Sequence, residues 1–393
     1  MAKRKIVKKG NHWDSIKFSS NIMMDALAKH LLGLAPYKMT DVGEVLETYC
    51  QLKDTQEETW LETWGKIASQ LTIAAKQKLA AQDDVSASAL FLRASTYWRT
   101  ALMCFSNSKD KRMVTFCQHS HDCYEQYLQL SGYPGEFVKI PYENSFLPGH
   151  FYRSPVAQSD APLMILTPGR DTWAEDTRWI YDGLLQRGIH CLVFDGPGQG
   201  YTLRQQGLPF RPDWENVLTP VINFAIANLA GIDAQRIGAL GVSFGGFLLP
   251  RACAFEPRVK VAVCDPGNLN WGGHFADIFA KAMRIPTIFR PKAIDGMMTD
   301  YAWKHGVSRK QVISELRRYD NRNIIDRVTC ETLVLDGTAE INQGESQKFF
   351  DALPEGHKYY HLFDEASTAQ SHAQMGGYSQ AAEFLCDWLV HHL

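Results

Sequence analysis

The chain has 393 residues, of which 45% are hydrophobic and 21% charged, and its formal net charge is −2. This near-neutral charge excludes the strongly basic surface that a nucleic-acid partner requires. The length and composition are typical of a soluble globular enzyme with one large domain or two smaller ones.

Near its start the chain carries a short basic run, Lys3-Arg4-Lys5, without the apolar stretch that would make it a signal peptide. No stretch of the chain stays apolar over the length of a membrane span. The nine cysteines are scattered and include no Cys-x-x-Cys pair, which favours free thiols in a reducing compartment. We therefore expect a cytoplasmic protein with no membrane partner.

The first third of the chain, residues 13–130, shows helical periodicity and no strand alternation. Apolar residues recur at helical spacing, for example Leu90, Ala94, Tyr97 and Ala101. A Ser-Gly-Tyr-Pro-Gly run at residues 131–135 then breaks the pattern. We predict four or five helices here, which form an N-terminal helical cap domain over residues 1–134.

After this break the chain reads as an α/β protein. Residues 137–141 and 149–152 have the pattern of two antiparallel strands joined by a turn. Apolar runs typical of buried strands follow at residues 163–166, 191–194, 237–240, 259–264, 332–335 and 359–362. Helical segments alternate with them at residues 176–187, 214–230 and 346–353, and a last helix spans 378–391. This alternation predicts a doubly wound, mostly parallel sheet whose two parts are residues 135–267 and 329–393.

The interval between residues 265 and 329 interrupts the alternation, because it contains no strand pattern. Three stretches in it have helical character, at residues 274–283, 292–303 and 308–318. An insertion at this place lies above the carboxyl ends of the parallel strands, where loops form the walls of a site. We predict a helical lid insertion over residues 268–328.

Residues 241–245 read Gly-Val-Ser-Phe-Gly, the Gly-x-Ser-x-Gly pattern of a nucleophile elbow. A short apolar strand precedes the pattern and a helix-compatible stretch follows it. In this setting Ser243 lies on a sharp turn with its hydroxyl exposed, and Gly241 and Gly245 remove side chains that would collide there. Gly246 lets the helix begin close to the strand. This context makes Ser243 the candidate nucleophile.

A serine nucleophile needs a histidine base and a carboxylate that orients it, and in this fold the chain order is serine, acid, histidine. Two carboxylates follow the strand at residues 332–335. We favour Glu340, because its loop position suits a histidine on the neighbouring loop, and keep Asp336, at the strand end, as the alternative acid. His372, in a polar loop before the last helix, is the candidate base, with His357 and His361 as nearby rivals.

Backbone N–H groups must stabilise the oxyanion that forms during acyl transfer. The N–H of Phe244, directly after the nucleophile, is one expected donor. The second is expected in the loop after an early strand, at Gly169 and Arg170. Asp171 and Glu175 follow, and they either position the substrate or cap the next helix.

Two other motifs resemble ligand sites. His119 and His121 are two positions apart in a helical stretch, so their side chains point to different faces and do not suit a shared metal. The Asp-Gly-Pro-Gly-Gln-Gly run at residues 195–200 lacks the spacing of phosphate-binding loops and reads as a tight turn that lines the site. We predict no metal and no cofactor.

Four stretches together resemble one branch of the α/β-hydrolases. They lie at residues 195–200, 241–247, 250–258 and 387–389. The branch holds fungal polyketide-shortening hydrolases of pigment pathways, bacterial dihydroxypseudooxynicotine hydrolase and fermentation–respiration switch proteins. The resemblance covers residues 130–393 by motif, and the helical first third in kind.

The resemblance implies an α/β-hydrolase fold and a serine enzyme without a cofactor that cleaves a C–C bond next to a ketone, or a related ester. It places the nucleophile on Ser243, the base on His372 and the family's aspartate position on Glu340. It also implies a homodimer and N-terminal helices that roof the active site. Arg170 stands where the family often has glycine, which leaves the oxyanion geometry and the substrate's charge open.

We therefore predict a serine hydrolase for an apolar or aromatic small molecule. One alternative is an acyltransferase or cyclase that uses the same triad. Another is a non-catalytic pseudo-hydrolase that acts by protein contacts, against which the intact elbow and the late histidine argue.

Overall fold

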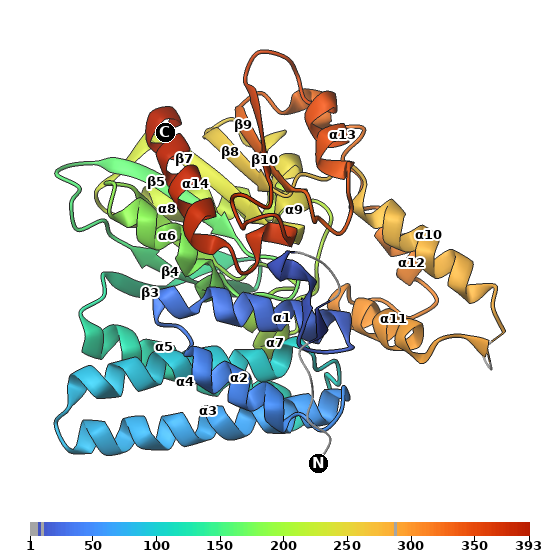
Figure 1. The fold of residues 1–393 in the computed structure, drawn as a ribbon. Helices are drawn as coiled ribbons and strands as arrows, with labels where there is room; N and C mark the ends of the chain where they lie inside the picture. The colour runs from blue at the N-terminus through green and yellow to red at the C-terminus, as the bar shows by residue number, and fades with distance from the viewer. Residues whose placement is uncertain (1–6, 9–11, 287–288) are drawn as a thin grey trace.

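An eight-stranded mixed sheet lies at the centre of the structure, a computed structural model that describes residues 7–8, 12–286 and 289–393. Figure 1 shows helices of the first third stacked on one side of the sheet region, and the helices of residues 271–316 projecting to another side. Among the described residues, no helix combines the length and the apolar character that a membrane span requires.

The predicted helical N-terminal region is confirmed. Its helices are α1 (Ile22–Gly33), α2 (Val42–Gln51), α3 (Glu57–Ala80), α4 (Asp84–Met103) and α5 (Lys111–Ser131). The carboxylate of Asp41 accepts two N–H groups of the first turn of α2, and Gly132 ends α5 with a φ of 64°. Trp60 and Trp64 of α3 are fully buried in the helical core. Two short 3-10 turns (Trp13–Ser15 and Ala35–Tyr37) and the β1–β2 pair (Val7–Lys8 with Ile16–Lys17) complete this region.

The sheet has the strand order β10-β9-β8-β7-β5-β6-β4-β3. Its strands are β3 (Gly135–Tyr142), β4 (Ser145–Tyr152), β5 (Ala161–Thr167), β6 (His190–Phe194), β7 (Ile232–Val242), β8 (Val259–Asp265), β9 (Glu331–Gly337) and β10 (Lys358–Phe363). The β3–β4 and β4–β6 pairs are antiparallel, and the remaining pairs are parallel. The predicted doubly wound, mostly parallel sheet is confirmed.

Both faces of the sheet are covered. Successive strand residues point to opposite faces, so Met164 and Leu166 join the core under α6 (Arg178–Leu185), α14 (Tyr378–His392) and the N-terminal helices. Leu163 and Ile165 join the core under α8 (Glu215–Asn228), α9 (Phe244–Cys253) and α13 (Glu345–Ala352). Burial on both faces explains why the strands read as continuous apolar runs.

The insertion contains α10 (Trp271–Met283), α11 (Lys292–Lys304) and α12 (Val312–Leu316), followed by a 3-10 turn (Ile325–Arg327). The third helix is shorter than the predicted 308–318. Gln311 explains the difference, because its side-chain oxygen accepts both the backbone N–H and the hydroxyl of Ser308 and so forms a turn before the helix.

Two elements near the sheet differ from the predictions. The helix predicted at 176–187 is a 3-10 turn (Ala174–Thr177) followed by α6, since the Asp176 carboxylate accepts the N–H of Trp173 and caps the chain there. A short helix, α7 (Gly200–Gln206), was not predicted. It begins at the glycine-rich turn, where the Asp195 carboxylate accepts the N–H of Tyr201.

A buried ion pair joins the N-terminal helices to the sheet region. Arg99 of α4 donates its Nε–H to Asp176 at 2.6 Å, and both side chains are almost fully buried, with exposures of 0% and 1%. Removing one member of such a pair strands the other charge inside the protein.

We expect Arg99→Met to lower the free energy of unfolding by about 3–5 kcal/mol, because it leaves the Asp176 carboxylate buried without its cation. Urea denaturation measures this change. Arg93→Met is the matched control on the same helix, because its pair with Glu44 is partly exposed, and it should cost about 1 kcal/mol or less. Equal losses in the two variants would contradict the structural role of the buried pair.

Candidate active site

Ser243 lies at the turn between β7 and α9 with a φ of 55° and a ψ of −118°. A positive φ is unusual for a residue with a side chain. The neighbouring glycines permit the turn: a Cβ on Gly241 would lie 2.2 Å from the Gly245 carbonyl oxygen, and one on Gly245 would lie 2.4 Å from that of Thr167. A Cβ on Gly246 would lie 2.5 Å from the carbonyl oxygen of Pro266. The elbow geometry expected from the sequence is therefore present.

Three side chains from different loops form one chain of hydrogen bonds. The Oγ of Ser243 lies 2.8 Å from Nε2 of His372, and Nδ1 of His372 lies 2.6 Å from Oε1 of Glu340. Glu340 follows β9, and His372 begins the 3-10 turn His372–Gln374 after β10. The loops meet because β7, β9 and β10 run parallel and end at the same edge of the sheet.

The competing carboxylate has a different role. Asp336 accepts the hydroxyl of Tyr360 at 2.8 Å and the N–H of Gly337 at 2.8 Å, and these bonds fix the end of β9. Of the rival histidines, His361 stacks on Phe384 with ring centroids 3.7 Å apart, and His357 is exposed. The structure therefore brings Glu340, and neither Asp336 nor a rival histidine, into the hydrogen-bond chain.

The electrostatics of the pair favour a charged acid beside a basic imidazole. Burial lowers the pKa of His372, but the charge and the hydrogen bond of Glu340 raise it more, so the net pKa lies above the ordinary value. Burial raises the pKa of Glu340, but the charge and the hydrogen bond of His372 bring it below the ordinary value. Each partner thus stabilises the charged form of the other.

The N-terminal segment holds the loop that carries His372. The indole N–H of Trp13 donates to the Thr368 carbonyl at 3.1 Å, and the Gln370 amide donates to the Asp14 carboxylate at 3.1 Å. His30 of α1 is bonded to the hydroxyl of Tyr378 at 2.7 Å. Residues from the first third of the chain therefore contact the chain on both sides of His372.

Two N–H groups near Ser243 lack an acceptor among the described residues, those of Phe244 and Arg170. The N–H of Gly169 instead donates to the hydroxyl of Thr172 at 3.0 Å. A Cβ on Gly169 would lie 3.1 Å from Cβ of Ser243, so the loop passes directly beside the serine. Within the predicted Gly169–Arg170 region, Gly169 therefore provides the close approach and Arg170 has the unpaired N–H.

Neither Asp171 nor Glu175 caps the following turn, since Asp176 does so. Asp171 forms ion pairs with Lys304 of α11 and with the neighbouring Arg170. Glu175 is largely buried near His150. The capping alternative is wrong for both residues, and contact with a substrate stays a prediction.

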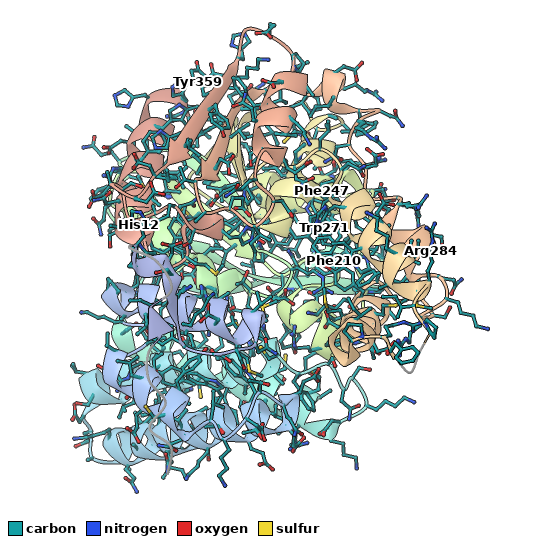
Figure 2. The ribbon with its side chains drawn as sticks, turned by 45° about the vertical axis from the view of Figure 1, so that its right-hand side comes forward. His12, Phe210, Phe247, Trp271, Arg284 and Tyr359 are labelled. Carbon is teal, nitrogen blue, oxygen red and sulfur yellow. The ribbon has the colours of Figure 1, made fainter. Side chains whose placement is uncertain are left out.

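Aromatic residues of the insertion pack on the helix that follows Ser243. Trp271 lies 4.1 Å from Phe244 between ring centroids and 6.2 Å from Phe247. Figure 2 shows Phe210, Phe247 and Trp271 close together where the insertion meets the sheet region. Phe279 and Tyr301 are buried in the same core. Most of these rings therefore form the core between the insertion and α9.

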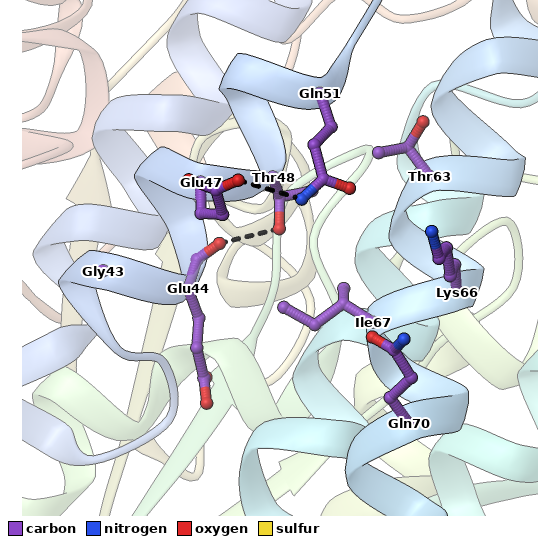
Figure 3. A pocket seen from close by; sticks show the side chains of 9 residues that line it. All are labelled: Gly43, Glu44, Glu47, Thr48, Gln51, Thr63, Lys66, Ile67 and Gln70. Atoms are coloured by element: carbon purple, nitrogen blue, oxygen red, sulfur yellow. Dashed lines mark hydrogen bonds between the residues drawn. The ribbon is translucent and has the colours of Figure 1, made fainter.

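Neither of two hollows in the structure is lined by Ser243, Glu340 or His372. A groove of about 360 Å³ lies between α2 and α3, where the Gln51 amide donates to Glu47 and the Thr48 hydroxyl to the Glu44 carbonyl (Figure 3). An enclosed space of about 10 Å³ lies beside Glu175 and Asp195.

The sequence motifs set aside as ligand sites have local partners. His119 packs on Trp98, and His121 packs on Phe137, so the two rings face different neighbours. Within the described ranges, no three His, Cys, Asp or Glu side chains are grouped so that they could hold a metal. Asp195, in the glycine-rich turn, accepts backbone N–H groups.

Two residues near the site were not found from the sequence. Gln199 donates to the Pro168 carbonyl at 2.6 Å and so fixes the loop beside Ser243. Asp265, at the end of β8, is fully buried, and burial raises the pKa of its carboxyl to about 7. Its charge also raises the pKa of His372. For Asp265 the only sequence signal was a polar residue at the end of a buried strand, whereas Gln199 lies in the glycine-rich turn that the sequence placed along the site.

Comparisons with known proteins agree on one family. Residues 43–339 match the family described as "Esterase FrsA-like". The chain is 30% identical over 363 residues to Hydrolase LUC6 of a Fusarium species, covering 82% of this chain and 84% of that protein. It is 32% identical over 286 residues to 20-hydroxy-prefusarin hydrolase FUS2 of Gibberella moniliformis, covering 69% of this chain and 65% of that protein.

A solved structure shares the fold. The crystal structure of the 2,6-dihydroxy-pseudo-oxynicotine hydrolase aligns with a TM-score of 0.73 at 19% identity, covering 92% of this chain and 95% of that chain. The alignment includes the helical N-terminal region as well as the sheet.

We expect the pKa of His372 to fall in Glu340→Gln. The Glu340 carboxylate raises the pKa of His372, whereas burial lowers it. When the charge of Glu340 is removed, the effect of burial remains and the pKa falls. Titration of the imidazole by NMR measures the change. Asp336→Asn is the matched control, because Asp336 bonds Tyr360, and it should leave the titration close to that of the wild type. An unchanged His372 pKa in Glu340→Gln would show that the bond is absent in solution.

Proposed function

Because the chain belongs to the FrsA-like esterase family, we propose that it is a serine hydrolase with Ser243 as nucleophile, His372 as base and Glu340 as the acid that orients the base. The family resemblance and the α/β-hydrolase fold expected from the sequence are confirmed, and the chain is a hydrolase. The unbroken hydrogen-bond chain from Ser243 to Glu340 is the observation that carries the catalytic assignment.

The geometry supports an acyl-enzyme mechanism. Ser243 Oγ attacks a carbonyl carbon while its proton passes to Nε2 of His372, and Glu340 stabilises the resulting imidazolium. The N–H groups of Phe244 and Arg170 stabilise the negative charge on the former carbonyl oxygen. The leaving group departs with the proton of His372, and a water molecule, deprotonated by the now neutral His372, then releases the acyl group from the serine.

We propose that the bond cleaved is a C–C bond next to a ketone, or a closely related ester. In C–C cleavage the leaving group departs as an enolate or phenolate-stabilised carbanion, which His372 protonates with the proton it took from Ser243. The names of two similar proteins, 20-hydroxy-prefusarin hydrolase and 2,6-dihydroxy-pseudo-oxynicotine hydrolase, support hydrolysis of hydroxylated organic compounds.

The charges around Arg170 support a neutral substrate. Its guanidinium is paired with Asp300 and Asp171, and Lys304 pairs with the same two carboxylates, so two cations and two anions balance. Within this four-residue cluster no positive charge is in excess. This balance supports a neutral ketone or ester, and the resemblance to polyketide-shortening hydrolases supports an apolar or aromatic one.

Acyl transfer and ring closure use the same acyl-enzyme and differ only in what intercepts it. We propose hydrolysis because the similar proteins are named hydrolases. A homodimer also remains a proposal, based on the family resemblance alone.

Ser243→Ala should abolish turnover of an aryl ester while the circular dichroism spectrum stays unchanged. A serine-directed fluorophosphonate should add mass at Ser243 of the wild type, as intact-protein and peptide mass spectrometry would show. Glu340→Gln should lower kcat by roughly 10³–10⁴-fold, by analogy with the loss of the orienting charge in other triads. Undiminished labelling of Ser243→Ala, or a normal rate in Glu340→Gln, would contradict the assignment.

The substrate class predicts a preference for bulky aryl substrates. We expect kcat/KM for aryl ketones or aryl esters to exceed that for short-chain acetate esters by at least about tenfold, or about 1.4 kcal/mol of transition-state binding. Product masses from a panel of β-diketones and esters separate C–C cleavage, ester cleavage and acyl transfer. Equal activity on acetate esters would argue for an open site and against a polyketide-like substrate.

A further inference from the structure

We propose that Asp300 of the insertion is a positioning residue for the oxyanion hole, because it holds the side chain of Arg170, the residue next to the glycine that passes beside Ser243. The proposal rests on the proposed function, in which the backbone N–H of Arg170 stabilises the oxyanion. It assigns the insertion a part in the chemistry beyond covering the site.

The contact between Arg170 and helix α11 is extensive. The Nη2 of Arg170 lies 2.6 Å from Oδ2 of Asp300, and its guanidinium carbon lies 3.9 Å from the centre of the Tyr301 ring. Nη1 lies 3.3 Å from Asp171 on the loop itself. The side chain of Arg170 is only 9% exposed. A planar guanidinium bound at two edges and stacked on a ring has one orientation, and this orientation constrains the backbone to which it is attached.

Lys304 provides a second link between the same helix and the same loop. Its ammonium group bonds Asp171 and lies 3.1 Å from Oδ1 of Asp300, and its side chain is 3% exposed. Asp300 therefore bridges two cations, and two consecutive loop residues are held from α11. Burial raises the pKa of Asp300, but Arg170 and Lys304 lower it by more than burial raises it. The carboxylate therefore keeps its charge in this partly buried position.

Contacts on two sides hold the loop of residues 168–171 in place. Gly169 has no side chain with which to fix itself, and it passes directly beside Ser243. On the sheet side, Gln199 holds the loop through the carbonyls of Pro168 and Gly169. On the side of the insertion, the Arg170 side chain is held by its ion pair with Asp300 and its contact with the Tyr301 ring, both on α11.

The insertion also contacts the second oxyanion residue. Trp271 of α10 packs on the Phe244 ring at 4.1 Å, and it stacks on Tyr301 of α11 at 5.9 Å with an interplanar angle of 17°. The side chains of the two donor residues, Phe244 and Arg170, therefore both contact one connected group of insertion residues. A displacement of the insertion changes the geometry of both donors at once.

Asp300→Asn tests the inference, because it removes the charge with little change in shape. We expect kcat and kcat/KM to fall together by at least about tenfold while KM stays constant, the pattern of an interaction made only in the transition state. Affinity for a trifluoromethyl ketone, which forms an oxyanion on the serine, should fall in parallel. Asp295→Asn is the matched control on the same helix, because the partly exposed Asp295 pairs with Arg309 and Arg290 of the insertion and not with the loop of Arg170, and it should leave these values unchanged.

A double-mutant cycle identifies the route. Arg170→Met keeps the backbone N–H but removes the guanidinium, so Asp300→Asn should cost little more in that background. If Asp300→Asn does not fold, Arg170→Lys keeps the charge, loses the two-edged contact and should show the same loss of kcat. A full additional loss in the double variant would show that Asp300 acts by another path and would overturn the inference.

A measurement without turnover separates this inference from the proposed function. Amide hydrogen exchange of residues 169–172 should be about tenfold faster in Asp300→Asn than in the wild type and unchanged in Asp295→Asn. Equal exchange in all three proteins would overturn the inference whether or not the protein is active. Absent fluorophosphonate labelling of wild-type Ser243, with faster loop exchange in Asp300→Asn, would overturn the proposed function and leave the positioning contact established.

Discussion

The backbone turn at Ser243 is the constraint on which the rest of the site depends. A φ of 55° and a ψ of −118° are tolerated only because glycines at 241, 245 and 246 let three backbone segments approach one another. The turn aims the hydroxyl out of the sheet edge, away from both packed faces. Every other group of the site has to reach that one point from a different loop.

Three parts of the chain meet this requirement separately. The sheet positions Ser243 and Glu340 at the ends of β7 and β9. The N-terminal segment holds the loop of His372 through Trp13 and Asp14. The insertion holds the loop of Arg170 through α11. The helices beyond the sheet are therefore contacts of the catalytic loops, in addition to being covers for apolar surface.

Features that depend on local sequence were predictable. The strands were found because burial on both faces makes them continuous apolar runs, and the elbow because its glycines and serine lie within six residues. The choice of Glu340 over Asp336 followed from the expected loop positions, and the bond to His372 agrees with it. Features that depend on distant partners were not predictable. The partner of Arg170 is 130 residues away, and nothing local to Arg170 or Asp300 indicates the pair. The 3-10 turn before α6 likewise depends on the side-chain cap of Asp176, and the late start of the insertion's third helix depends on Gln311.

Arg170, which stands where the family often has glycine, shows how a distant partner changes the interpretation of a site. An arginine beside an oxyanion loop suggests a pocket for an anionic substrate when only the sequence is considered. Its side chain instead lies in a charge-balanced, partly buried cluster with Asp171, Asp300 and Lys304. Removing one member of the cluster leaves the opposite charges without their partner where water is largely excluded. The arginine is therefore unavailable to a substrate while the insertion is seated, and its charge serves to attach the insertion to the loop that faces the reacting carbonyl.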